Sequence, residues 1–110
     1  EEWVEQARSL TEIVETIGEL IDKVWYNRHK VREECIEDGI IKLVPKGAPN
    51  DPHTIHDDIW AGALKAAKRV ERKYGIDNVG PWTDFEWGML NGKLSALRWV
   101  LGDEWDMLDT

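Results

Sequence analysis

A heptad stripe of apolar residues in the first third of the chain constrains the fold most. Positions seven apart hold Trp3, Leu10, Ile17, Val24 and Val31, and positions four residues later hold Ala7, Val14, Ile21 and Cys35. Apolar residues at this spacing share one face of an α-helix. No proline occurs before residue 45, so we predict one helix from about residue 2 to 37, which ends at Asp38-Gly39. Ser9 and Glu12 have capping-box spacing, and a start at Ser9 is the alternative.

Residues 82–102 predict another helix, because both of its ends carry capping signals. Thr83 and Glu86 have the spacing of a capping box, and Gly102 follows the last turn, where glycine takes a left-handed conformation without steric cost. This helix is apolar on two sides. One row holds Phe85, Met89, Ala96 and Val100, and the other holds Leu90, Leu94, Leu97 and Leu101. We therefore expect neighbours on both sides of it.

The middle of the chain combines an extended segment with a further helix. Residues 40–44 are mostly β-branched or apolar and are followed by prolines and glycines, so they should form an extended cover over the helices or a strand that pairs with another chain. Asp51-Pro52 predicts a helix start, and this helix should end at Tyr74-Gly75. Its small residues at 61–63 and 66–67 should pack closely against a small-residue strip of the last helix, formed by Gly88, Gly92 and Ala96.

Together these signals predict one all-α domain over residues 1–110. Its architecture would be a three-helix bundle with one long N-terminal helix, an extended connection near residues 40–50 and a short C-terminal tail. The first helix is predicted to be much longer than the other two, so part of its apolar stripe would remain for another chain to cover. We therefore expect dimerisation to complete the bundle.

Charge and composition exclude several classes of partner. The formal net charge of −8 argues against nucleic acid and anionic membrane, which both need net positive contact. No apolar run approaches the roughly 18 residues that a membrane span takes. The single cysteine, Cys35, cannot form an internal disulfide and is compatible with a reducing cytoplasm. We therefore expect a cytoplasmic protein with neither nucleic acid nor membrane as its partner.

The expected partner is a second copy of the chain or another protein. Seven tryptophans occur in 110 residues, and tryptophan suits interfaces because it joins a large apolar area to an N–H donor. The expected partner-binding residues are Ile17, Ile21 and Val24 on the first stripe, Trp25 next to it, and Trp105 in the acidic tail. Residues 61–75 are rich in Lys and Arg, and could face the acidic first helix of the same chain or of a second copy.

The N-terminal acids form the pattern Glu1-Glu2-x-x-Glu5 followed by Glu19-x-x-Asp22. This pattern resembles the paired acidic motif of the all-α nucleoside triphosphate pyrophosphohydrolases of the MazG type. The resemblance implies that Glu2, Glu5, Glu19 and Asp22 would hold Mg²⁺, which would bridge the nucleotide phosphates in a site completed by a dimer partner. A continuous first helix would instead separate Glu2 from Asp22 by about 30 Å and leave a solvated acidic face.

Two other polar segments are candidates for chemistry. His53-x-x-His56-Asp57-Asp58 contains the residue types of a divalent-metal site, although aspartates in a first helical turn also complement the helix dipole. The polar residues 26–30 with Arg32, which include His29, could bind an anionic ligand or mark an exposed stretch of helix. The preferred interpretation assigns no catalytic residue, no metal and no cofactor.

Three functions follow from these patterns. The preferred one is a small acidic helical protein that works through association with itself or another protein and has no catalytic activity. The second is a Mg²⁺-dependent nucleoside triphosphate pyrophosphohydrolase, as the acidic resemblance implies. The third is an acidic mimic of DNA that inhibits a nucleic-acid enzyme, suggested by rows of acids such as Glu5, Glu12 and Glu19.

Overall fold

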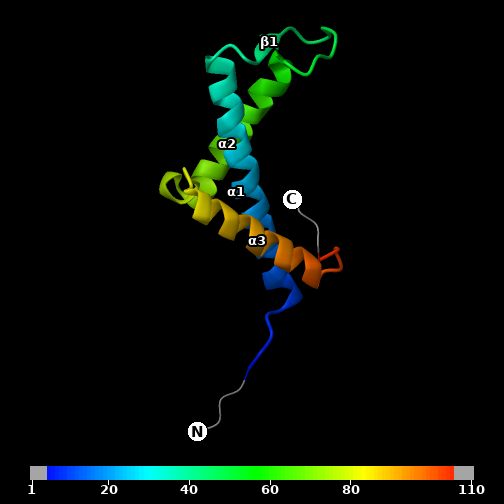
Figure 1. Ribbon diagram of the computed structural model, residues 1–110, viewed down its shortest axis with the longest axis vertical. Coiled ribbons are helices and arrows are strands. Elements are labelled where there is room, and N and C mark those ends of the chain that lie inside the picture. The colour runs from blue at the N-terminus through cyan, green and yellow to red at the C-terminus, as the bar shows by residue number, and fades with distance from the viewer. Residues whose placement is uncertain (1–4, 106–110) are drawn as a thin grey trace. The chain divides into compact units, whose positions relative to one another are not determined.

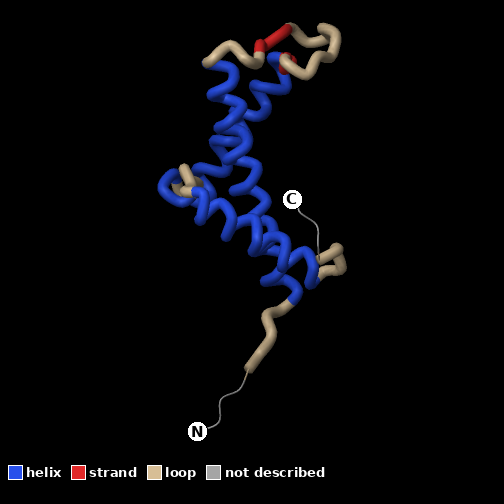
Figure 2. Tube along the Cα trace, in the orientation of Figure 1, coloured by secondary structure: helices blue, strands red, loops and turns tan. Residues whose placement is uncertain are grey.

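The computed structural model describes residues 5–105, and this part of the chain is mostly helical (Figures 1 and 2). In chain order its elements are α1 (Leu10–Glu37), β1 (Lys42–Val44), β2 (Thr54–His56), α2 (Asp57–Tyr74), the 3₁₀ helix η1 (Ile76–Asn78) and α3 (Asp84–Val100). The predicted three helices are therefore confirmed within the described residues. The parallel pair β1–β2 departs from a purely helical class.

The chain divides into two compact units, and α1 contributes to both of them. Unit 1 comprises residues 1–22 and 83–110, and so holds the first part of α1 together with α3. Unit 2 comprises residues 23–82, and so holds the rest of α1, the two strands, α2 and η1. The single domain over residues 1–110 stays a prediction.

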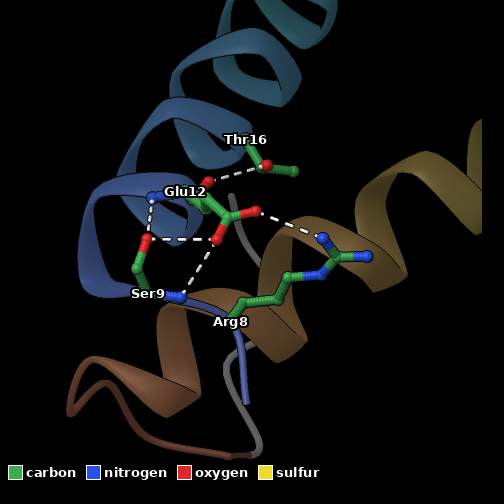
Figure 3. A network of polar contacts seen from close by, with 4 residues as sticks. All are labelled: Arg8, Ser9, Glu12 and Thr16. Carbon is green, nitrogen blue, oxygen red and sulfur yellow. Dashed lines mark hydrogen bonds and ion pairs between the residues drawn. The ribbon is translucent and has the colours of Figure 1, made fainter. Parts of the chain in front are cut away.

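Helix α1 begins eight residues later than the heptad stripe predicts, and the prediction of a helix from residue 2 is wrong for the described residues 5–9. The alternative start at Ser9 is the observed one (Figure 3). The Glu12 amide donates to Ser9 Oγ at 3.1 Å, and the Ser9 amide donates to Glu12 Oε1 at 3.3 Å. These two bonds satisfy donors that no helical turn could reach, whereas residues 5–10 are exposed and gain nothing from the stripe.

The extended segment finds its partner within the chain. β1 pairs in parallel with β2, with Lys42 opposite Thr54, Leu43 opposite Ile55 and Val44 opposite His56. This corrects the prediction that residues 40–44 cover the helices or pair with another chain. It also corrects the start of α2, which lies at Asp57 and not at residue 51. The Asp51 carboxylate accepts the His53 amide at 2.8 Å, so it forms a turn into β2 where a helix cap was predicted.

The predicted helix ends are confirmed where glycine closes them. Gly39, Gly75 and Gly102 all have positive φ, at 76°, 90° and 112°. After α3, the Gly102 amide donates to the Trp99 carbonyl and the Asp103 amide to the Arg98 carbonyl, which is the Schellman arrangement. The capping box at the start of α3 is also present, since Thr83 and Glu86 exchange side-chain-to-backbone bonds of 3.2 and 3.0 Å.

Each unit has its own set of buried apolar residues. In unit 1 these are Ile17 and Leu20 of α1 and Leu90 and Leu94 of α3. In unit 2 a cluster forms between α1, α2 and the segment after η1, and its buried members are Tyr26, Ala67, Val70 and Val79. Trp25 and Tyr74 pack against that cluster from its edge. Helix α1 therefore supplies buried side chains to both units, Ile17 and Leu20 to unit 1 and Tyr26 to unit 2.

Candidate functional site

The two apolar sides of α3 have different surroundings. Leu90 and Leu94 are buried, and Leu94 is only 1% exposed. Phe85 on the other side is 77% exposed, and Trp99 is 51% exposed. Successive helical residues are about 100° apart, which places Phe85, Met89, Gly92, Ala96 and Trp99 on the side opposite Leu90 and Leu94. We call these five residues the outer face of α3.

The outer face of α3 ends in an exposed aromatic pair. The rings of Trp99 and Trp105 meet edge to face, with 5.2 Å between their centroids. Trp105 is 67% exposed, and Val100 and Leu101, which follow Trp99 in the chain, are exposed as well. An apolar helix face that ends in two indoles has the composition of a protein–protein contact, because indole rings offer large rigid contact areas. None of the five residues of the outer face has a titratable side chain.

The small residues of α3 lie within this face or beside it. A Cβ atom added at Gly88 or at Gly92 would meet no atom within 4 Å, and Ala96 is half-buried. The strip is therefore smooth, and the described residues place no backbone against its glycines. Close packing of a helix on Gly88, Gly92 and Ala96 stays a prediction.

The predicted partner-binding residues separate into two groups. Ile17 and Val24 are buried, and Trp25 is half-buried with its ring stacked on His29 at 5.2 Å. These three side chains are used inside the chain, because the covered part of the stripe provides the helical cores. Ile21 and Trp105 are exposed. The structure therefore shifts the candidate surface from the middle of α1 to Ile21, the outer face of α3 and Trp105.

The acidic set of the resemblance is only partly described. Glu2 lies outside the described residues, and Glu5 is exposed before the start of α1. Glu19 and Asp22 lie one turn apart on α1. The described residues contain no group of three or more His, Cys, Asp or Glu that could hold a metal ion.

Unit 2 contains a buried histidine between two indoles. The His29 ring stacks on Trp25 at 5.2 Å and on Trp60 of α2 at 4.9 Å, and His29 is 3% exposed. Burial lowers the pKa of His29, while the nearby Glu33 carboxylate, with an oxygen 3.5 Å from Nε2, acts in the opposite direction. His29 is therefore a core side chain and not part of an exposed anion-binding patch.

A second polar contact ties α1 to α2 in the same unit. The Tyr26 hydroxyl donates to Glu71 Oε2 at 2.6 Å. Burial and this hydrogen bond together raise the pKa of Tyr26, so the phenol stays protonated and remains a donor. The hydroxyl is thus engaged with a carboxylate and serves the packing of the two helices. Sequence reasoning missed both polar links, and the four-residue spacing of Trp25 and His29 was the one signal that could have indicated a stack.

The histidine pair before α2 does not form a metal group. The His56 ring contacts the Ala48 carbonyl oxygen through Nε2 at 2.9 Å, and His53 is exposed. A pocket of about 350 Å³ beside β2 is lined by His56, Asp51 and Arg32, among others. A larger pocket of about 530 Å³ in unit 2 is lined by Tyr26, Lys30 and Glu33 with Val79 and Pro81, and no histidine, cysteine or serine lines it.

Comparisons of the chain with protein-family models, with curated proteins and with solved structures found no match. No helix of the described residues is both long and apolar enough to cross a membrane. The outer face of α3, extended by Trp105, is the candidate functional site because it is an apolar helix face that the chain leaves exposed.

Proposed function

We propose that this protein acts by associating with another protein chain, through the outer face of α3 and Trp105, and not by catalysis. One observation carries the proposal. α3 is apolar on two opposite sides, and the side with Phe85 and Trp99 is exposed whereas the side with Leu94 is buried. Large exposed apolar patches on soluble domains commonly mark interaction sites, because water solvates them poorly.

Charge supports a protein as the partner. The formal net charge of −8 opposes binding to the phosphates of nucleic acid. α3 carries Asp84 and Glu86 in its first turn, Lys93 near its middle and Arg98 in its last turn, so the polar positions of the helix have both signs. A mixed polar rim around an apolar centre is the usual composition of a protein–protein interface.

The test uses a tagged chain that is purified from cells that also make an untagged copy. We expect the tagged protein to carry the untagged copy or another protein at a fixed stoichiometry. The double variant Phe85→Ser/Trp99→Ser should lose this companion, because it removes the two largest anchors of the face. The matched control is Ile59→Ser on α2, where an equally exposed apolar residue (61%) lies outside the face. A companion that survives the double variant, or a natural chain without any companion, would contradict the proposal.

A second candidate is the Mg²⁺-dependent pyrophosphohydrolase, and one observation favours it. The start of α1 at Leu10 removes the continuous helix that would have held Glu5 away from Glu19 and Asp22. A true Mg²⁺ site would stabilise the fold by about 2.7 kcal/mol at a hundredfold excess over Kd. We expect no shift in melting temperature with Mg²⁺ or Mn²⁺ and no pyrophosphate release from nucleoside triphosphates. Release that disappears in Glu19→Gln would establish the enzyme.

A further inference from the structure

The outer face of α3 has a pattern that fits a second copy of itself. Phe85 lies seven residues before Gly92, and Trp99 lies seven residues after it. In an antiparallel pair centred on Gly92, Phe85 of each copy therefore lies beside the partner's Trp99. Met89 in turn lies beside the partner's Ala96, so a large side chain meets a small one. This size alternation is what interdigitating helix faces require.

The centre of the pattern permits a close approach. Space beside Gly92 and beside Gly88 is open, since an added Cβ at either position meets nothing within 4 Å. A second helix backbone can therefore come near at the middle of the face, while the aromatic residues at its two ends close around it. One surface that fits itself in this way forms an isologous interface with two-fold symmetry.

Side-chain size distinguishes the antiparallel arrangement from a parallel one. A parallel pair in register would place Met89 against the partner's Met89, whereas the antiparallel pair places it beside the partner's smaller Ala96.

The exposed area is of the right order for such a dimer. Phe85, Trp99 and Trp105 together expose on the order of 400 Å² of aromatic surface in each copy. A stable interface takes about 800 Å² from each partner. The aromatic anchors thus supply about half of the requirement, and Met89 and Val100 of the same row are exposed too.

We infer that the partner at the outer face of α3 is a second copy of this chain, held antiparallel with Gly92 at the two-fold axis. The inference rests on the proposed function and names its partner and register. It predicts which pairs of positions come within the 4.4–6.8 Å between Cα atoms that a disulfide bridges.

The test places single cysteines on α3 of the full chain, in a Cys35→Ser background. Gly92→Cys should cross-link to itself on oxidation, because the two copies of this position meet at the axis. Gly88→Cys should not, because its two copies lie about 12 Å apart along the helices. A mixture of Gly88→Cys and Ser95→Cys chains should form the mixed disulfide, since these positions face each other on one flank. Complete labelling of each reduced variant by a small thiol reagent controls for accessibility.

Sedimentation of the natural chain at several concentrations, together with the cross-links, tests separately whether the chain associates, whether its partner is a second copy, and whether the pair is antiparallel. A dimer in which Gly88→Cys cross-links to itself, as Gly92→Cys does, would be parallel and would overturn the register while leaving association intact. The natural chain could instead be monomeric by itself and bind another protein, which Phe85→Ser/Trp99→Ser releases. This result would contradict the inference that the partner is a second copy, and would still support the proposed function. A dimer with the predicted cross-links, lost in Phe85→Ser/Trp99→Ser, supports both.

Discussion

Unit 2 and unit 1 use tryptophan in opposite ways. In unit 2, Trp60 is buried and stacks on His29, which in turn stacks on Trp25. In unit 1, the rings of Trp99 and Trp105 meet edge to face and both remain exposed. The first arrangement stabilises a fold, because it removes apolar surface from water within one chain. The exposed pair of unit 1 can lose its contact with water only when a partner binds. The tryptophans of unit 2 thus have a structural role, and we assign those of unit 1 a role in recognition.

The largest expected effect is on the buried side of this comparison. Trp60→Ala should lower the free energy of unfolding by about 3–5 kcal/mol, since it removes a buried indole and leaves a cavity beside His29. Trp99→Ala is the matched control, and should leave the unfolding of the isolated chain nearly unchanged while it abolishes association. Denaturant titration at low protein concentration measures both. Equal losses of stability in Trp60→Ala and Trp99→Ala would contradict the assignment of a structural role to one tryptophan and a recognition role to the other.

The hydrogen bond from Tyr26 of α1 to Glu71 of α2 offers a second test of the structural role assigned to unit 2. Tyr26→Phe removes the hydroxyl that donates to Glu71 at 2.6 Å and leaves a half-buried carboxylate without that donor. We expect a loss of about 1.5–3 kcal/mol in the free energy of unfolding, the range for hydrogen bonds to charged groups. Tyr26→Phe/Glu71→Gln should recover part of this loss, because the remaining amide is neutral. A Tyr26→Phe chain as stable as the natural one would show that the contact contributes nothing.

Acidification should act on unit 2 through His29. Burial lowers the pKa of His29 below its ordinary value of 6.5, whereas the imidazole of the unfolded chain keeps that value. Below pH 6.5 the unfolded state therefore binds more protons, so stability is full above this pH and declines as the pH falls towards the lowered pKa. Glu33 and Glu71 oppose this shift, and Lys30 and Arg32 reinforce it.

The pH dependence is measured by thermal unfolding between pH 7.5 and about 5, above the range where most carboxylates titrate. His29→Gln should flatten the profile in this interval. His53→Gln, which changes an exposed histidine, should leave it as in the natural chain. A natural profile that does not change with pH would show that His29 binds its proton equally well in both states.

The smallest expected effect lies on the exposed side, at Gly92. Gly92→Ala should stabilise the isolated chain by up to about 1 kcal/mol, because alanine is the better helix former and its Cβ meets no atom. The same methyl group should weaken the dimer, since it separates the two backbones at the axis. The melting temperatures of both chains are measured over a range of protein concentrations. Gly92→Ala should melt higher than the natural chain at low concentration and lower than it at high concentration. If the variant has the higher melting temperature at every protein concentration, the predicted close contact at Gly92 is wrong.

The start of α1 shows what a sequence can leave open. Both signals were present, a heptad stripe through Trp3 and Ala7 and a capping box at Ser9 and Glu12. The capping box decides where α1 begins, because its hydrogen bonds form between residues close in the chain. The apolar stripe stabilises a helix only where other side chains cover it. In the described residues the side chains before α1 are exposed, so no burial extends the helix further.

The sequence alone determined the features that close within one helical turn. The capping box of α3, the glycine ends after α1, α2 and α3, and the two apolar rows of α3 all depend on neighbours in the chain. Tertiary structure decided which row of α3 is buried, that β1 pairs with β2, and that Trp60 completes the stack on His29. These outcomes depend on contacts between residues distant in the chain. Periodicity can show that a face is apolar, but only packing decides whether the same chain covers it.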